Sequence, residues 1–557
     1  MKRSIDTNFY SLLILNLVLW TIPIFFLFNL QVYSFSNYKN KIENTYDISK
    51  TIIPKRGNIY VKDKFGNLYL VASSKKVYDV YYNPKLAKDI KKELEEIGNI
   101  LGIDIDKNEV DLRDKKTFLI AKEIDESTKE KLSSLKFDSL FFESKYLRFY
   151  PEGNFLSTII GFANLNENNI LEGKYGIEKY YDTVLKGEPG LYYGVKKIQS
   201  DTPGSDLILN IDYFLQKYAE KVLDEGVNKT KAEGGLIVVL STDGKVLTIA
   251  ENPRYDLNKY YEVKDYRIFQ TKLSQNYEPG SVMKAVTYFI GLDLNVFDPE
   301  EKYYDAGVVN VNGWNIYNFD KKGRGYITLK EALEQSLNTG AVYVENKIGH
   351  YNFLKYLKTF QLDKKPYIDL PNLTDGNIKN LEKNSRDLRD VNFYTASFGH
   401  GISISSIHLL NIFNTFANNG TMRSMYIVDK IVNAEGRMIQ NKPTDITTIG
   451  KKTTFEKLHS LLEGVTERGS GKYAKTEGYS IAGKTGSAYI PKTNEPGYSN
   501  EVINTYVCYF PVKNPKFVIL VRIDKPDQGL AMVTTVPLAK EIIDFLINYY
   551  NISPDKL

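Results

Sequence analysis

The residues best suited to chemistry in this sequence are Ser281 and Lys284, which follow the turn residues Pro279 and Gly280. The composition after the turn predicts a helix, so the hydroxyl and the amine would share one helical face. A serine hydroxyl becomes a useful nucleophile only when a neighbouring base takes its proton. Lysine serves as that base when burial or a nearby cation lowers its pKa from about 10.4 toward neutrality. We therefore interpret the two residues as a nucleophile and its base.

A serine three residues before a lysine is a weak pattern by itself. The same spacing occurs at Ser73 and Lys76 and at Ser133 and Lys136, where we assign no function. The assignment of Ser281 and Lys284 therefore depends on further segments that supply the other groups an acyl transfer needs.

The first of these segments is Ser336-Leu337-Asn338. A helix that begins near Thr328, with Glu331 placed for a capping box, is expected to deliver it to the site. The Ser336 hydroxyl can relay a proton between Lys284 and a leaving amine, and the Asn338 amide can hydrogen-bond the lysine and a substrate backbone. Taken alone, the triplet is equally typical of an ordinary helix end.

The second segment is Lys484-Thr485-Gly486-Ser487, which follows a predicted strand. Lys484 supplies a cation that can hold a carboxylate and help to lower the pKa of the first lysine. Gly486 would leave room for a substrate backbone to lie against the strand. The Thr485 and Ser487 hydroxyls can anchor a terminal carboxylate, although Lys-Thr-Gly is otherwise a common turn sequence.

An oxyanion hole is the remaining requirement of acyl transfer, because the tetrahedral intermediate carries a negative oxygen. We predict that the backbone N–H groups of Ser281 and Ser487 form it. No metal or cofactor is expected, since the histidines are scattered without ligand spacing. They stand at His350, His400, His408 and His459.

Length and charge limit the class of protein. A chain of 557 residues exceeds one compact core, so two or more domains are expected. The formal charge of +5 is small for this length and gives no sign of nucleic-acid binding. The one cysteine, Cys508, excludes an intrachain disulfide and stands in an apolar run typical of a buried core.

Residues 9–35 form a mostly apolar run without a charged residue, long enough to cross a bilayer of about 30 Å. We predict an uncleaved transmembrane anchor here, because no small-residue cleavage site is evident. Residues 1–8 would be a short cytoplasmic tail, with the rest of the chain outside. Basic residues on both sides leave this orientation equivocal by charge alone.

The remaining chain divides near residue 230. Residues 36–230 carry mixed α and β signals, including a predicted helix over 84–97 that Gly98 could end. Residues 231–557 begin with a predicted hairpin, 236–240 and 246–250 around Asp243-Gly244, and end with strands and a helix over 538–550. This order predicts an α+β domain built on an antiparallel sheet with flanking helices.

The order Ser-x-x-Lys, Ser-x-Asn, Lys-Thr-Gly resembles that of the β-lactamases and penicillin-binding proteins. Tyr-Glu-Pro-Gly-Ser-x-x-Lys from Tyr277, Ser-Leu-Asn from Ser336 and Ala-Gly-Lys-Thr-Gly-Ser-Ala from Ala482 together resemble a class B penicillin-binding protein. Earlier fragments are similar to the motifs of that family's N-terminal pedestal, or dimerisation, domain. They are Arg56-Gly57-x-Ile59, Arg148-x-Tyr150-Pro151, Gly176-Ile177-Glu178 and Gly187-x-x-Gly190.

Two residues depart from the family pattern. Ser487 stands where threonine is usual, which keeps the hydroxyl, and His400 stands between two glycines where glutamine is commoner. The role of His400 is left open between a site residue and an ordinary loop histidine. The sequence Tyr-Glu-Pro-Gly before Ser281 and the compact pedestal resemble class B proteins of the division type more than those of the elongation type.

The resemblance implies a single-pass protein of the bacterial inner membrane whose catalytic domain is extracytoplasmic. It implies a D,D-transpeptidase that cross-links peptidoglycan stem peptides through an acyl-enzyme on Ser281 and is acylated by β-lactams. The implied partners are a glycan polymerase of the SEDS class and other wall-synthesis or divisome proteins. A β-lactam sensor, a β-lactamase or carboxypeptidase, and a non-enzymatic scaffold for the polymerase remain as alternatives.

Overall fold

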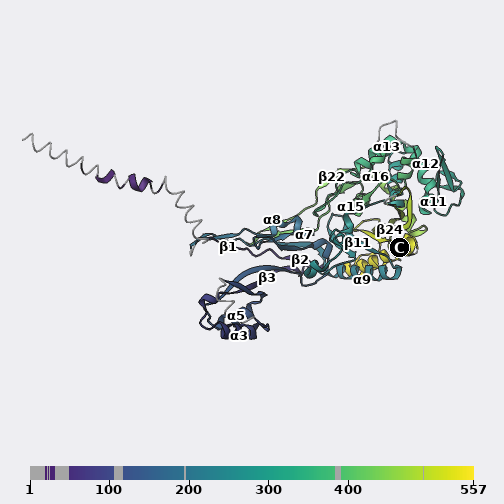
Figure 1. Cartoon of the computed structure of the whole chain (residues 1–557). Coiled ribbons are helices and arrows are strands. Elements are labelled where there is room, and N and C mark those ends of the chain that lie inside the picture. The colour runs from purple at the N-terminus through teal and green to yellow at the C-terminus, as the bar shows by residue number, and fades with distance from the viewer. Residues whose placement is uncertain are drawn as a thin grey trace, which may run out of the picture. The chain divides into compact units, whose positions relative to one another are not determined.

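The computed structural model describes residues 49–105, 117–193, 196–382, 390–492, 495–527 and 529–556, with scattered positions between 15 and 31 (Figure 1). The described residues form two compact units, one that contains residues 49–54 with 187–203 and the other residues 55–186 with 204–556, each within the ranges given above. In the first unit, β1 (Ser49–Ile52), β8 (Gly190–Tyr193) and β9 (Lys196–Gln199) form an antiparallel sheet in that order.

The predicted tail, residues 1–8, and most of the predicted anchor, residues 9–35, lie outside the described residues. Across the described part of the chain, no helix combines the length and the apolar character needed to span a membrane.

The second unit begins with a sheet of seven strands. Six follow the order β21-β20-β10-β2-β3-β4, and β5 also pairs with β3. The strands are β2 (Ile59–Lys62), β3 (Leu68–Tyr82), β4 (Phe118–Ile124), β5 (Leu140–Phe149), β10 (Asp206–Asp212), β20 (Val428–Val432) and β21 (Met438–Gln440). Two of them, β20 and β21, come from the second half of the chain, so this sheet joins segments far apart in sequence.

Two helices cover the outer part of this sheet, α3 (Ile90–Leu101) and α5 (Glu126–Ser134). A separate 3-10 turn occupies Pro84–Leu86, so the predicted single helix over 84–97 is divided. The prediction that Gly98 ends the helix is wrong. Gly98 is buried within α3, and Gly102, with a φ of 68°, ends the helix in the left-handed conformation that glycine adopts at low cost.

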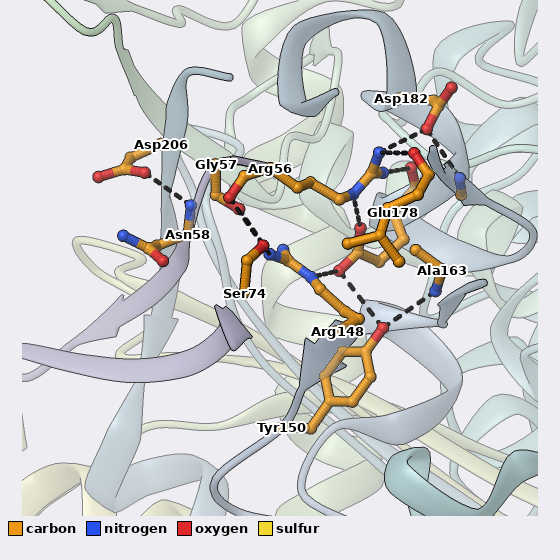
Figure 2. A network of polar contacts seen from close by, with 12 residues as sticks. Arg56, Gly57, Asn58, Ser74, Arg148, Tyr150, Ala163, Glu178, Asp182 and Asp206 are labelled. Carbon is orange, nitrogen blue, oxygen red and sulfur yellow. Dashed lines mark hydrogen bonds and ion pairs between the residues drawn. The ribbon is translucent and has the colours of Figure 1, made fainter. Parts of the chain in front are cut away.

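Figure 2 shows the buried ionic network that holds the start of β2 against β5 and α7 (Gly176–Tyr180). Glu178 accepts hydrogen bonds from Arg56 Nε at 2.7 Å and from Arg148 Nε at 2.6 Å. All three side chains are at most 1% exposed. Arg56 also pairs with Asp182 at 2.7 Å, and Arg148 donates to the Gly57 carbonyl at 2.7 Å.

This network explains three of the four fragments that resemble the pedestal motifs. Burial raises the pKa of Glu178, but the charges of Arg148 and Arg56 outweigh it and hold the pKa below its ordinary value. Gly176 has a φ of 58°, and a Cβ there would lie 2.3 Å from the Ile159 carbonyl. Glycine is therefore required for α7 to begin where it does.

The site is carried by a five-stranded antiparallel sheet of order β12-β11-β25-β24-β23. Its strands are β11 (Gly234–Ser241), β12 (Val246–Asn252), β23 (Ala482–Pro491), β24 (Tyr498–Phe510) and β25 (Phe517–Asp524). The predicted hairpin forms as β11 and β12. The antiparallel α+β architecture predicted for this region is confirmed.

Alternate residues of this sheet enter two different cores, as the two-residue period of a strand requires. Leu236, Val238 and Leu240 pack in a core with α10 (Lys284–Asp293) and α15 (Ser406–Ala417). Ile237 and Val239 pack on the opposite face with α9 (Tyr213–Thr230) and α18 (Val536–Tyr550). Both faces are covered, which explains why these strands are almost continuously apolar.

Further helices of this unit lie between Leu329 and Glu467, and the last of them packs against β23. They are α11 (Leu329–Glu334), α12 (Asn338–Ile348), α13 (His350–Thr359), α14 (Asp390–Ala396) and α16 (Lys452–Glu467). The capping box between Thr328 and Glu331 is present as predicted. Two small hairpins precede it, β14 (Lys302–Asp305) with β17 (Gly325–Thr328) and β15 (Val308–Val311) with β16 (Trp314–Tyr317).

Candidate active site

Ser281 lies in a 3-10 turn, η6 (Gly280–Met283), that continues into α10 at Lys284. The expected turn-to-helix transition is therefore present, but Ser281 precedes the α-helix rather than lying in its first turn. The Ser281 side chain is partly exposed, whereas Lys284 is fully buried. The Ser281 hydroxyl makes no hydrogen bond to any residue in the described ranges.

Ser336 lies between α11 and α12, where the chain turns with a φ of 57° at this residue. A left-handed conformation is unusual for serine. Lys284 Nζ donates to the Ser336 carbonyl at 2.5 Å and lies 3.4 Å from its hydroxyl. Lys484 Nζ reaches the same hydroxyl at 2.9 Å. Two lysines from distant segments thus converge on one serine.

The β23 strand packs directly against the turn that carries Ser281. A Cβ on Gly486 would lie 2.7 Å from the Pro279 carbonyl and 3.2 Å from the Val282 nitrogen. A Cβ on Gly280 would lie 3.3 Å from the Ser487 carbonyl group. The structure therefore supplies a reason for glycine at 486 that sequence reasoning missed, because the glycine makes room for the turn itself.

Burial controls the charge of both lysines. Desolvation, followed by the neighbouring Lys484 cation, lowers the pKa of Lys284 well below its ordinary value. Desolvation alone lowers the pKa of Lys484 to about 7. Within the described ranges, neither amine lies within ion-pair distance of a carboxylate, so nothing restores the charged form. The arrangement favours a neutral amine at Lys284, as a general base requires.

The hydroxyl residues beside these buried lysines line a cleft of about 460 Å³. Of the sequence-predicted residues, Ser281, Ser336, Asn338, Thr485 and Ser487 line it. The Asn338 amide donates to the Tyr317 carbonyl at 2.8 Å, so in this structure it faces the hairpin rather than Lys284. Thr485 Oγ1 and Ser470 Oγ are 2.6 Å apart, and Ser487 Oγ accepts from the Ala531 N–H at 3.1 Å.

Three residues near Ser281 contact one another in a way that sequence reasoning did not predict. His400 lines the cleft, and its ring lies against Tyr498 with centroids 5.4 Å apart. Glu278 accepts a hydrogen bond from Tyr498 Oη at 3.1 Å and lies 3.9 Å from His400 Nδ1. His400 was noticed for its departure from the family pattern, but nothing in the sequence placed these three residues together.

The comparison with protein families agrees with the site. Residues 234–544 match the penicillin binding protein transpeptidase domain, and residues 51–205 match the penicillin-binding protein dimerisation domain. The first match covers more than half of the chain. The protein therefore belongs to the penicillin-binding protein transpeptidase family, and its combination of domains is that of class B.

Individual relatives extend this assignment over nearly the whole chain. The chain is 26% identical to stage V sporulation protein D of Bacillus subtilis over 90% of its own length and 79% of the relative. It is 28% identical to the peptidoglycan D,D-transpeptidase FtsI of Buchnera aphidicola, over 78% and 76% of the two chains. Penicillin-binding protein 2X of Streptococcus thermophilus shares the fold, with a TM-score of 0.79, 21% identity and coverage of 91% and 81%.

Proposed function

We propose that this protein is a serine-type D,D-transpeptidase that cross-links peptidoglycan stem peptides and is acylated by β-lactams. One observation carries the proposal: two buried lysines from distant segments meet at the Ser336 hydroxyl, in a cleft that Ser281 lines. Membership of a family defined by a transpeptidase domain agrees with this chemistry.

In the proposed acylation, neutral Lys284 takes the proton of Ser281, whose oxygen attacks the carbonyl between the last two D-alanines of a stem peptide. A covalent intermediate divides one difficult transfer into two easier steps. Ser336 passes the proton to the departing D-alanine, since its hydroxyl lies between the two lysine amines. The N–H groups of Ser281 and Ser487 are assigned to the oxyanion hole.

The strand β23 is assigned to binding of the donor peptide. Lys484, Thr485 and Ser487 would hold its terminal carboxylate, with the peptide backbone beside Gly486. Asn338 would turn from the Tyr317 carbonyl toward the bound peptide. An amine of a neighbouring stem peptide then attacks the acyl-enzyme, which completes the cross-link and frees Ser281.

Residues 9–35 are assigned to a single membrane anchor, with 36–230 as pedestal and 231–557 as an extracytoplasmic transpeptidase domain. In support, Trp20, Phe25 and Phe26 are each more than two-thirds exposed, an arrangement suited to a lipid environment. A glycan polymerase of the SEDS class is the proposed partner. A role in division agrees with the likeness to FtsI.

The direct test uses the full chain in detergent with a fluorescent penicillin. Wild-type protein is expected to be labelled stoichiometrically, and Ser281→Ala is expected to lose all labelling. The matched control is Ser133→Ala, because Ser133 also stands three residues before a lysine, Lys136. This variant should keep its labelling. Equal labelling of the Ser281→Ala protein would refute the assigned nucleophile.

A second measurement separates the alternatives. A transpeptidase forms a stable acyl-enzyme with penicillin and transfers a peptide ester to an added amine. Rapid penicillin turnover would favour a β-lactamase. Cells that still grow and cross-link wall with Ser281→Ala would favour a scaffold, whereas labelling without any transfer would favour a sensor.

A further inference from the structure

A buried carboxylate, Glu278, lies against His400, one of the residues that line the cleft beside Ser281. The Glu278 side chain is only 11% exposed, and it accepts hydrogen bonds from the Gly401 N–H at 3.0 Å and from Tyr498 Oη at 3.1 Å. These two donors fix the carboxylate between the loop that follows α14 and the start of β24. They leave lone pairs of both carboxylate oxygens available.

No strong cation compensates this carboxylate. In the described part of the chain, its one potential ion-pair partner within 4.0 Å is His400, at 3.9 Å. Burial lowers the pKa of His400 to about 4, so the imidazole is neutral at physiological pH. Tyr498 and Phe398, the other residues against the ring, carry no charge there.

The backbone holds this group close to Ser281. The Gly280 N–H donates to the Gly399 carbonyl at 3.2 Å, and a Cβ on Gly399 would lie 2.2 Å from the Gly280 carbonyl oxygen. The segments before Ser281 and before His400 are therefore in direct contact. Both residues line the same cleft, whose other wall includes Thr485 and Ser487 of β23.

We propose that Glu278, with His400 and Tyr498, forms the subsite that binds the cationic amine of the acceptor stem peptide. This inference depends on the proposed transpeptidase function. A primary amine with a pKa near 10.4 reaches the cleft as an ammonium, which the buried lysines behind the cleft would repel whenever they are charged. A carboxylate next to His400 attracts it, and a neutral imidazole adds a hydrogen-bond acceptor without repelling it.

The chemistry after binding requires no further group. The ammonium releases one proton to solvent, and the nitrogen forms a C–N bond to the acyl carbon as the ester bond to Ser281 breaks. The second amine proton returns to Ser281 Oγ through Lys284. Glu278 and His400 therefore bind and orient the acceptor, while the covalent step uses the machinery already assigned.

Glu278 could instead serve only as a latch that holds the Gly401 loop and β24. The substitution Glu278→Gln separates the two roles, because a glutamine oxygen still accepts from the Gly401 N–H and from Tyr498 while the charge is lost. A matched control is Glu501→Gln on β24, the strand that carries Tyr498. The Glu501 carboxylate is 52% exposed and pairs with Lys525.

The experiment uses the full chain in detergent, with a peptide thioester as donor. It measures acylation by fluorescent penicillin, transfer to glycinamide as a cationic acceptor, and transfer to methanol as a neutral one. In Glu278→Gln, the KM for glycinamide should rise roughly 10- to 100-fold, because this is the loss of affinity expected when a hydrogen bond to a charged group is removed. In the same variant, partition to methanol should stay within about twofold of the wild-type value. His400→Gln keeps a neutral hydrogen-bond acceptor and should raise the KM for glycinamide less than Glu278→Gln does.

Salt gives an independent readout. Added salt should raise the glycinamide KM of the wild type and of Glu501→Gln, and should have little effect on Glu278→Gln, because the screened attraction is already lost. An unchanged glycinamide KM in Glu278→Gln would overturn the proposal, and so would equal losses in penicillin acylation, methanol transfer and glycinamide transfer. Failure of the transpeptidase assignment itself would appear differently, as a wild type that forms no acyl-enzyme.

Discussion

In the first half of the chain two buried arginines share one buried glutamate, whereas in the second half two buried lysines share only a serine hydroxyl. Arg56 and Arg148 lie 2.7 Å and 2.6 Å from the oxygens of Glu178. Lys284 and Lys484 meet at Ser336, and within the described ranges no carboxylate lies in ion-pair distance of either amine.

The difference follows from the chemistry of the two side chains. A guanidinium stays charged in any protein environment, so a buried arginine needs a carboxylate. A lysine can escape the cost of burial by losing its proton, which leaves a neutral amine able to act as a base. The arginine network is therefore suited to holding the fold, and the lysine pair is suited to the catalytic role proposed above.

The largest effect is expected from Lys284→Met. Loss of a positioned general base typically slows a reaction by about 10²- to 10⁴-fold, and we expect penicillin acylation to slow by about a thousandfold. Stopped-flow acylation measures the rate. Lys457→Met, at an exposed position on α16, is the control and should acylate at the wild-type rate. A rate for Lys284→Met within tenfold of wild type would assign the base elsewhere.

Glu178→Gln should produce the largest loss of stability. The change leaves two buried guanidinium groups without their shared anion, which costs about 3 to 5 kcal/mol. Thermal unfolding of the full chain measures it, and the remaining folded protein should still be acylated by penicillin. A loss below about 1 kcal/mol would show that the network does not hold the pedestal.

Lys484→Met should have the opposite sign and stabilise the protein by about 1 to 3 kcal/mol at pH 7 while it impairs acylation. The wild-type cost of burying the ammonium is fully present below the folded pKa of about 7 and disappears as pH rises toward the unfolded value of about 10.4. The advantage of the variant should therefore shrink between pH 7 and 10. A variant that is less stable than wild type at pH 6 would contradict this reasoning.

The smallest effect is expected from Asp182→Asn, the outer partner of Arg56. This side chain is 21% exposed, and an asparagine oxygen can keep the hydrogen bonds from Arg56 and from the Gly173 N–H. The expected loss is below about 1 kcal/mol. A loss as large as that of Glu178→Gln would mean that the network depends on its net charge rather than on the central glutamate.

Local sequence signals predicted the parts of the site that lie within one segment. The Ser281 turn, the capping box at Thr328 and the hairpin of β11 and β12 depend on neighbouring residues, and all three are present. The end of α3 was predicted at Gly98 but lies at Gly102, because an isolated glycine within an amphipathic helix is tolerated when the helix packs well.

Features that depend on tertiary contacts could not be predicted. The left-handed conformation of Ser336 is imposed by the packing of α11 and α12, since serine has no local preference for it. The contacts among Glu278, His400 and Tyr498 join three segments more than 90 residues apart in sequence. The pairing of β20 with β10 likewise unites the two halves of the chain in one sheet.

The pH dependence of the acylation rate tests the central claim most directly. If Lys284 is a buried amine whose pKa is strongly lowered, the wild-type rate should reach its plateau well below pH 10.4, the ordinary pKa of lysine. Stopped-flow measurements with one penicillin between pH 5 and 11 would define this plateau. A rate that keeps rising tenfold per pH unit up to pH 10 would show that Lys284 is charged in the resting enzyme and would contradict the account.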